Sequence, residues 1–196
     1  MTKPTRSKPT AAPSRKRRKT SRRPEPATTA GPPDRRLFRA CLWLAAVVAI
    51  MDQLSKWAAL AWLTPHVAIP VVPYFNLTLA FNSGAAFSFL SDAGGWQRWL
   101  FIILAGLISA FLWYWLRQLR RHEAWTGIAL GLILGGALGN VLDRLFRSGQ
   151  VVDFIDVYYR DSHWPAFNLA DSAISLGAAI IVIQAIHEAA SSGKDE

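Results

Sequence analysis

Four long apolar stretches alternate with more polar segments along the chain. They cover roughly residues 37–63, 96–116, 124–146 and 168–187. A helix needs about 20 mostly apolar residues to cross the hydrocarbon core of a bilayer, so the pattern predicts four membrane-spanning helices. Tryptophans lie near several of their ends, which is typical of side chains at a membrane–water interface.

The segment between the first two stretches has a different pattern. Residues 67–81 are rich in β-branched and aromatic side chains, and Pro65, Pro70 and Pro73 punctuate the segment. Such short runs bounded by prolines are typical of strands. The expected fold is therefore an all-α membrane protein with four transmembrane helices and a small β-sheet at the membrane surface.

Positive charge is concentrated before the first apolar stretch. The chain has 22 Lys and Arg against 13 Asp and Glu, and residues 1–36 are basic and rich in Pro, Ser and Thr. This segment has too few apolar side chains to form a core, so we predict a disordered basic tail. A basic run can bind nucleic acid or anionic lipids. Because an apolar helix follows directly, we favour membrane lipids and expect no nucleic-acid partner.

The distribution of Lys and Arg also predicts the orientation in the membrane. Residues 64–95 contain no Lys or Arg, whereas Arg117, Arg120 and Arg121 lie between the second and third spans. Basic loops stay in the cytoplasm, so both termini should be cytoplasmic and the two longer connections should lie outside. The predicted organisation is a cytoplasmic tail at 1–36, a membrane domain at 37–190 and a short cytoplasmic C-terminal tail at 191–196.

Charged and polar residues within the spans are costly, and they usually mark function. Asp52 and Lys56 are four residues apart, so they share a helix face and can form an ion pair. Ser55 and Lys56 could instead suggest a Ser/Lys protease dyad. Adjacent helical residues point about 100° apart, which disfavours that dyad.

Two further polar clusters lie near the predicted outer ends of spans. Asn82 and Gly84 indicate either a simple turn or a substrate-contacting turn. Asn140, Asp143 and Arg144 follow at i, i+3 and i+4, so they share a helix face. For Asp143 we favour a structural hydrogen-bond network.

A pair of carboxylates carries the clearest chemistry. Asp153 lies just outside the third span, and Asp171 lies one turn into the fourth, beside Asn168. Two close carboxylates do not both ionise easily, so one can hold a proton while the other activates a water molecule. This chemistry requires no metal and no other cofactor, and no HExxH motif is present.

Two other classes of protein remain as alternatives. A small transporter or proton pathway also uses buried Asp, Asn and Arg residues, but it predicts polar residues spread toward both membrane faces. A non-catalytic membrane binding protein needs no paired carboxylates. Clustering of the polar residues at the outer ends, and the presence of an Asp pair, favour a protease.

Five motifs in a fixed order carry a family resemblance. The sequence has DQLSK at 52–56, NSGAAFS at 82–88, GNVLDR at 139–144, VVDF at 151–154 and FNLADS at 167–172. Together they resemble lipoprotein signal peptidase (signal peptidase II), over roughly residues 37–187. The connection between Arg144 and Asp153 is slightly longer than the family pattern, and the basic tail is also longer.

The resemblance implies an aspartic endopeptidase of the bacterial inner membrane with a small periplasmic β-sheet and an active site near the periplasmic face. Such an enzyme cleaves prolipoproteins just before the diacylglyceryl-modified cysteine, and the cyclic peptide globomycin inhibits it. Asp153 and Asp171 correspond to the catalytic residues. Among the family's other polar residues, we expect Asn82 and Arg144 to be the chief substrate contacts, and nothing in the sequence requires more than a monomer. The other expected support or substrate-binding residues are Asp52, Lys56, Gly84, Asn140, Asp143 and Asn168.

Overall fold

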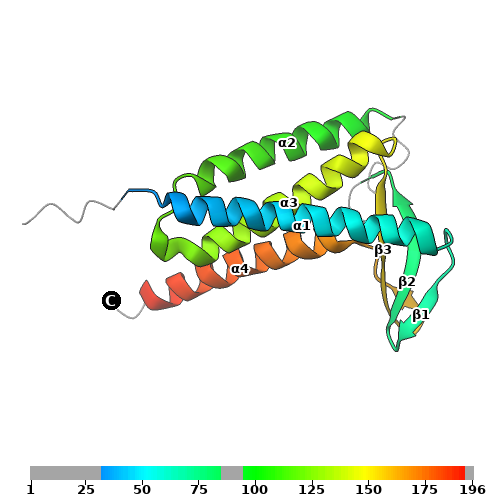
Figure 1. The fold of residues 1–196 in the computed structure, drawn as a ribbon. Helices are drawn as coiled ribbons and strands as arrows, with labels where there is room; N and C mark the ends of the chain where they lie inside the picture. Colours follow the sequence, from blue (N-terminus) through cyan, green and yellow to red (C-terminus); the bar gives the residue numbers. More distant parts are fainter. Residues whose placement is uncertain (1–31, 85–94, 193–196) are drawn as a thin grey trace, which may run out of the picture. The chain divides into compact units, whose positions relative to one another are not determined.

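The computed structural model describes residues 32–84 and 95–192 of the chain (Figure 1). Within these ranges four helices are long and apolar enough to cross a membrane, which confirms the predicted spans. The predicted disorder of the basic tail concerns mainly residues 1–31, which lie outside the described part. The helices are α1 (Arg35–Trp62), α2 (Gln97–Leu116), α3 (Ala124–Phe146, after the short 3-10 helix η2 at Arg121–Glu123) and α4 (Leu169–Ser192).

The ends of two helices differ from the predicted bounds. The first helix begins at Arg35, two residues earlier than expected, because Oδ1 of Asp34 accepts hydrogen bonds from the backbone N–H groups of Arg36 and Leu37 at 2.7 and 3.3 Å. A carboxylate in this position satisfies N–H groups that have no partner within the helix. The fourth helix continues to Ser192, beyond the apolar stretch that ends near residue 187.

Helix α3 is the centre of the bundle. Half of its most apolar window is buried (50%), against 11% to 17% in the other three helices, which leave large apolar side chains exposed. Small residues permit this close packing: a Cβ atom on Gly135 would lie 2.6 Å from the carbonyl oxygen of Ala45 in α1. The bundle therefore turns its apolar surface outward, as expected for helices in contact with lipid.

A four-stranded antiparallel sheet covers one end of the bundle (Figure 1). Its order is β1-β2-β3-β4; of the two middle strands, β2 comes from the connection between α1 and α2, and β3 from that between α3 and α4. In their pairing, Ala80 lies opposite Asp153 and Asn82 lies opposite Val151. The strands are β1 (Ile69–Val72), β2 (Phe75–Asn82), β3 (Val151–Tyr159) and β4 (Ser162–His163).

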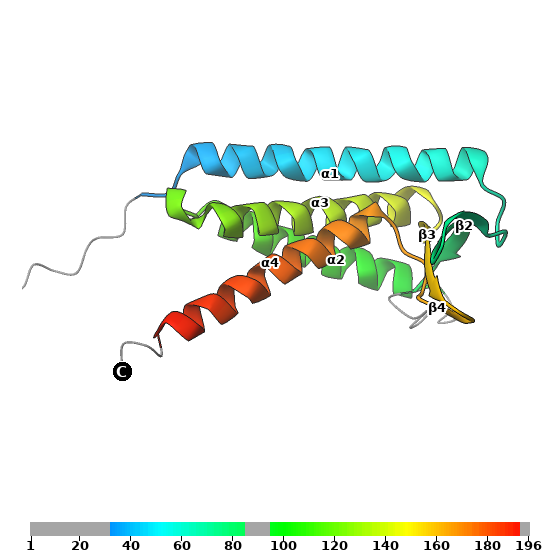
Figure 2. The same cartoon turned by 90° about the horizontal axis from the view of Figure 1, so that it is seen from below.

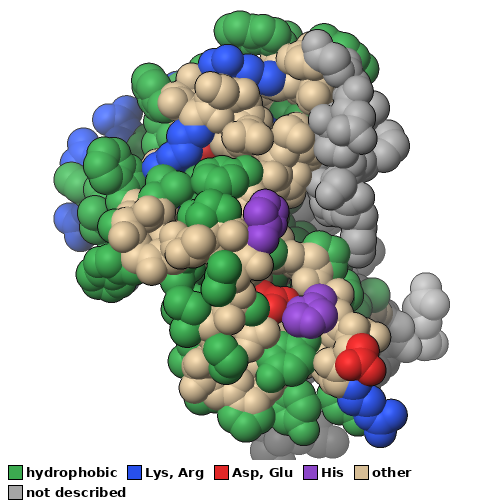
Figure 3. Space-filling view, turned by 90° about the vertical axis from the view of Figure 1, so that its right-hand side faces the viewer, with side chains coloured by type: hydrophobic (Ala, Val, Ile, Leu, Met, Phe, Trp, Pro, Cys, Tyr) green, Lys and Arg blue, Asp and Glu red, His purple; other side chains and the backbone are tan. Residues whose placement is uncertain are grey.

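The view from below shows how the helices meet the sheet (Figure 2). The beginning of α4 lies near α3 and the sheet, and its C-terminal half diverges from α1. Seen from the sheet end, hydrophobic side chains cover much of the surface and charged ones occupy only a few places (Figure 3). The end of α3, the start of α4 and strand β3 thus converge at the sheet end of the bundle, and the candidate site lies there.

Candidate active site

A cavity of about 500 Å³ lies where the sheet meets α3 and α4. Six of the ten residues predicted for the site line it, and the other four are buried. Much of the remaining lining is apolar, including Val151, Trp164, Phe167 and Ile174. The six lining residues are Asn82, Gly84, Asn140, Arg144, Asp153 and Asp171; the buried four are Asp52, Lys56, Asp143 and Asn168.

Asn168 joins the two predicted catalytic aspartates. Its side-chain nitrogen donates a 2.7 Å hydrogen bond to Oδ1 of Asp153. Its side-chain oxygen accepts a 3.0 Å bond from the backbone N–H of Asp171, and its own backbone N–H donates to Oδ2 of Asp171 at 3.2 Å. This reciprocal pair is a capping box at the start of α4, so the bonds that begin the helix also orient Asp171.

Asn140 connects Asp171 to the buried charges behind the cavity. Its side-chain nitrogen donates to Oδ1 of Asp171 at 2.8 Å, and its side-chain oxygen accepts a 2.9 Å bond from Nζ of Lys56. Both carboxylate oxygens of Asp171 therefore accept N–H bonds, in the first turn of a helix, where the helix dipole favours a negative charge.

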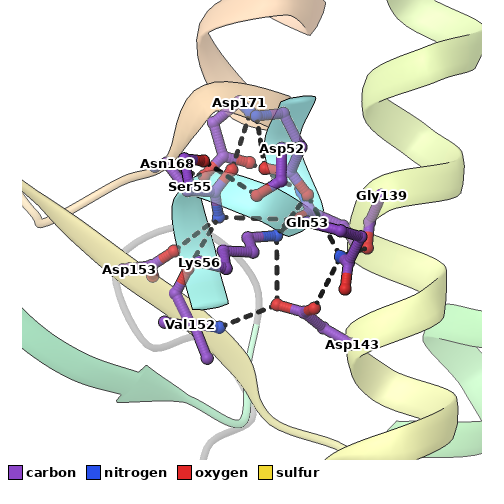
Figure 4. A network of polar contacts seen from close by, with 12 residues as sticks. Asp52, Gln53, Ser55, Lys56, Gly139, Asp143, Val152, Asp153, Asn168 and Asp171 are labelled. Atoms are coloured by element: carbon purple, nitrogen blue, oxygen red, sulfur yellow. Dashed lines mark hydrogen bonds and ion pairs between the residues drawn. The ribbon is translucent and has the colours of Figure 1, made fainter. Parts of the chain in front are cut away.

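Lys56 bridges two carboxylates in the interior (Figure 4). Its Nζ lies 2.8 Å from Oδ2 of Asp52 and 3.0 Å from Oδ2 of Asp143, and all three side chains have no exposed surface. The predicted Asp52–Lys56 ion pair is therefore present. Ser55 instead donates its hydroxyl to the backbone oxygen of Asp52 at 2.8 Å, so it forms no Ser/Lys dyad with Lys56.

Each carboxylate of this bridge holds the backbone beside one of the two site aspartates. Oδ2 of Asp143 accepts a 3.0 Å hydrogen bond from the backbone N–H of Val152, the residue before Asp153. Oδ1 of Asp52 accepts a 2.9 Å bond from the backbone N–H of Ala170, the residue before Asp171. The buried Asp–Lys–Asp bridge thus sets the spacing between strand β3 and helix α4.

The environment of Asp153 changes its acidity. Burial raises the pKa of its carboxyl group from 3.8 to about 7, and the negative charge of Asp171 acts in the same direction. Hydrogen bonds from Asn168 and Asn82 and the charge of Lys56 partly oppose this rise in pKa. A carboxyl group with such a pKa can hold a proton near neutral pH and release it during a reaction.

Arg144 and the turn after β2 form another side of the cavity. Nη2 of Arg144 donates a 3.0 Å hydrogen bond to the backbone oxygen of Gly84, and the Asn82 side chain accepts the N–H of Gly84 at 3.0 Å. Nε of Arg144 is buried without a partner among the described residues. Residues 85–88 of the motif that begins at Asn82 lie outside the described residues.

Gln53 and Arg147 belong to this network, although the sequence did not single them out. Nε2 of Gln53 donates to Oδ1 of Asp143 at 2.8 Å and to the backbone oxygen of Gly139 at 3.0 Å. Arg147 pairs with Oδ1 of Asp143. The i, i+4 spacing of Asp143 and Arg147 was the available signal, since it places both on one face of α3. Among the described residues, no group of three His, Cys, Asp or Glu side chains could hold a metal ion.

Comparisons with known proteins agree with this geometry. A profile of the family described as signal peptidase (SPase) II matches residues 44–187. The lipoprotein signal peptidase of Aeromonas hydrophila is 53% identical over 143 residues, covering 72% of this chain and 85% of the relative. That of Pseudomonas putida is 51% identical over 146 residues, covering 74% and 85%.

A solved structure shares the fold. It is described as a bacterial membrane enzyme, is 30% identical in sequence and superposes with a TM-score of 0.70. The match covers 78% of this chain and 91% of that one. The two chains therefore share an overall fold.

Proposed function

Since this chain belongs to the signal peptidase II family and is a membrane peptidase that removes signal peptides from prolipoproteins, we propose that Asp153 and Asp171 are its catalytic pair. The observation that carries the proposal is their shared position: both line the same cavity, and Asn168 contacts both. No other pair of carboxylates among the described residues lines this cavity.

The two aspartates have different roles in the proposed mechanism. Asp171 accepts N–H bonds at both oxygens and lies in the first turn of α4, which suits it to act as the charged base. Burial raises the pKa of Asp153 to about 7, which suits it to hold the proton before the reaction. We infer that a water molecule between them is the nucleophile.

The reaction then balances without any further group. Asp171 takes a proton from the water as its oxygen attacks the carbonyl carbon, and Asp153 gives its proton to the carbonyl oxygen. When the carbon–nitrogen bond breaks, the leaving amine receives a proton from Asp171 and the hydroxyl proton returns to Asp153. The pair regains its starting protonation, with no covalent intermediate.

The remaining predicted residues divide into substrate contacts and supports. Asn82, Gly84 and Arg144 line the cavity, and Nε of Arg144 can donate to a backbone carbonyl of an extended substrate. The other predicted residues support the site through hydrogen bonds to the two aspartates, to the backbone beside them, or to one another. These are Asp52, Lys56, Asn140, Asp143 and Asn168.

We further propose that the enzyme lies in the bacterial inner membrane with both termini in the cytoplasm and the cavity near the periplasmic face. The start of α1 and the end of α4 lie at the end of the bundle away from the sheet (Figure 1). The first connection beside the cavity, residues 64–95, contains no Lys or Arg, as expected for a translocated segment. The proposed substrate is a prolipoprotein cut before its diacylglyceryl-modified cysteine, globomycin the proposed inhibitor, and a monomer the proposed active form.

Cleavage by the purified protein tests the catalytic pair. A diacylglyceryl-modified prolipoprotein is incubated with wild type, Asp153→Asn, Asp171→Asn and the control Asp161→Asn, which removes an exposed carboxylate at the same end of the molecule. Each of the first two should lose at least about 100-fold in rate, because general acid–base catalysis contributes about that much. The control should cleave like wild type, and globomycin should inhibit both.

A cooperative thermal unfolding transition in detergent shows that each variant is folded. If either folded Asp→Asn variant at 153 or 171 cleaves at the wild-type rate, the assignment of the pair is wrong.

A further inference from the structure

Residues at the beginning of α1 and the end of α2 line a second hollow. These two helix ends lie at the opposite end of the bundle from the sheet (Figure 1). Its volume is about 480 Å³. Three arginines line it: Arg35 and Arg39 on one face of α1, and Arg117 at the end of α2. None of them belongs to the catalytic site.

The walls of the hollow hold one another in place. The backbone N–H of Asp34 donates a 2.9 Å hydrogen bond to the backbone oxygen of Leu119, which ties the start of α1 to the segment after α2. Phe38 and Trp113 make an edge-to-face contact with ring centroids 6.3 Å apart. The guanidinium of Arg117 lies over the Trp113 ring at 4.6 Å, so this cation has a defined position.

The hollow has a net positive charge. Within residues 32–84 and 95–192, no carboxylate forms an ion pair with any of the three arginines. The carboxylate in the lining, Asp34, already accepts two N–H groups of α1. The sequence of residues 1–31, outside the described part, has one acidic residue, Glu25, among many basic ones. All three arginines are exposed, so an anionic ligand can reach them.

The location indicates which anion it is. The three arginines stand at the ends of two membrane spans, at the depth where lipid headgroups lie. One turn further into α1 from Arg39, Trp43 is 74% exposed and so faces hydrocarbon. Phe38 adds an apolar wall within the hollow itself. A ligand that contacts both the arginines and these apolar side chains has a phosphate at one end and acyl chains at the other.

We propose that this hollow binds the headgroup of an anionic glycerophospholipid. Guanidinium groups bind phosphate oxygens in pairs of parallel hydrogen bonds, and basic pockets between membrane helices suit such headgroups. Because α1 and α2 both pack on α3, a lipid held between their ends stabilises the folded bundle by mass action.

The test uses the full chain in neutral detergent, with phosphatidylglycerol, phosphatidylcholine or glycerol 3-phosphate added. Bound lipid is counted by native mass spectrometry, and the melting temperature is measured in parallel. Arg39→Gln with Arg117→Gln removes two cations from the hollow. Arg36→Gln with Arg121→Gln is the matched control, since it removes two exposed cations at the same end that do not line the hollow.

Phosphatidylglycerol should bind wild type and raise its melting temperature, while phosphatidylcholine and glycerol 3-phosphate should do neither. Each arginine near an anionic headgroup contributes about a fivefold gain in affinity, so the double variant in the hollow should bind roughly 30-fold more weakly. The control pair should stay within about threefold of wild type, because neither side chain lines the hollow and exposed charges are partly screened by salt. If losing the Arg117–Trp113 contact unfolds the variant, Arg35→Gln with Arg39→Gln replaces it.

Three results would overturn the proposal. Equal losses in the two double variants would mean that only overall charge attracts the lipid. Binding of phosphatidylcholine as tight as that of phosphatidylglycerol would show that the negative charge of the headgroup is not recognised. If glycerol 3-phosphate alone raised the melting temperature as much as phosphatidylglycerol does, the hollow would bind a soluble phosphate ester and not a lipid.

Discussion

The side-chain nitrogen of Asn168 donates a 2.7 Å hydrogen bond to Oδ1 of Asp153. The oxygen of the same amide accepts the backbone N–H of Asp171, so one fully buried side chain relates both proposed catalytic residues. A donor to Asp153 favours the charged form of its carboxyl group and so restrains the rise in its pKa.

Removal of this donor should therefore change the pH dependence of cleavage. In wild type, kcat/KM should fall about tenfold per pH unit above about pH 7, where Asp153 loses the proton that the reaction needs. Asn168→Ala should lower kcat and move this alkaline limb to higher pH, because the pKa of Asp153 rises further. The pH profile of kcat/KM is the measurement.

Asn168→Ala also removes a helix cap and could lose stability by about 1 kcal/mol. Asn82→Ala removes a different donor to Asp153 and leaves the α4 cap intact, so it should shift the same limb in the same direction. An alkaline limb that stays in place, or moves to lower pH, in both variants would contradict the assigned role.

The raised pKa of Asp153 also predicts a pH-dependent gain in stability for Asp153→Asn. A carboxyl group with a pKa near 7 in the folded protein and near 3.9 when unfolded favours folding below about pH 4 and loses that contribution as pH rises to 7. At pH 8 the buried carboxyl group of Asp153 is ionised in the wild type, which lowers the stability of the folded state, and asparagine carries no such charge. Asp153→Asn should be more stable there, by up to about 4 kcal/mol, with little difference at pH 4.

Thermal melts at pH 4, 6 and 8 measure this difference in stability. Asp161→Asn is the control, because its exposed side chain should show no comparable trend. If the gain in stability of Asp153→Asn over wild type grew as pH fell, the prediction that the pKa of Asp153 is raised would be wrong.

Lys56 should matter for folding more than any single surface charge. Lys56→Met leaves two fully buried carboxylates, Asp52 and Asp143, without their shared cation. Breaking a buried pair costs about 3–5 kcal/mol, so the variant should be expressed poorly or melt far below wild type. Adding Asp143→Asn to Lys56→Met removes one of the two carboxylates that lost this cation and should restore part of the loss, as measured by thermal unfolding in detergent.

A double variant less stable than Lys56→Met alone would instead show that Asp143 acts independently of the bridge, through Val152 and Arg147.

A substitution at Gly139 tests how closely α1 approaches α3. A Cβ atom there would lie 2.5 Å from Oδ2 and 3.0 Å from Cγ of Asp52. Gly139→Ala should cost roughly 1–3 kcal/mol through overpacking and should also lower kcat, since Asp52 holds the backbone beside Asp171. Gly106→Ala in α2 meets nothing within 4 Å and should behave like wild type in melts and in cleavage. Equal melting of the two variants would contradict this packing.

The sequence predicted the spans and the site residues for different physical reasons. Apolar stretches near 20 residues long report burial in a bilayer directly, so the four helices were found within a few residues of their observed ends. Asp153 and Asp171 were conspicuous because charge is costly beside apolar segments. The pairing of β2 with β3 was not predicted, since strand register depends on partners distant in sequence.

The buried bridge shows the same limit. The spacing of Asp52 and Lys56 predicted their contact within α1. The spacing of Asp143 and Arg147 was likewise a local signal for their contact, but no local pattern could show that Asp143 completes the bridge from α3 or that Gln53 joins it. Those contacts depend on the close approach of α1 and α3, which the absence of a Cβ atom at Gly139 permits.

The hydrogen bond from Ala170 to Asp52 joins the start of the last membrane helix to the first. During synthesis, a chain that has inserted three spans already carries Asp153 but lacks Asp171 and the helix end that Asp52 holds. The proposed catalytic pair therefore comes together only when the fourth helix enters the membrane. Under the proposed mechanism, a chain that ends before α4 holds only one member of the pair and has no peptidase activity.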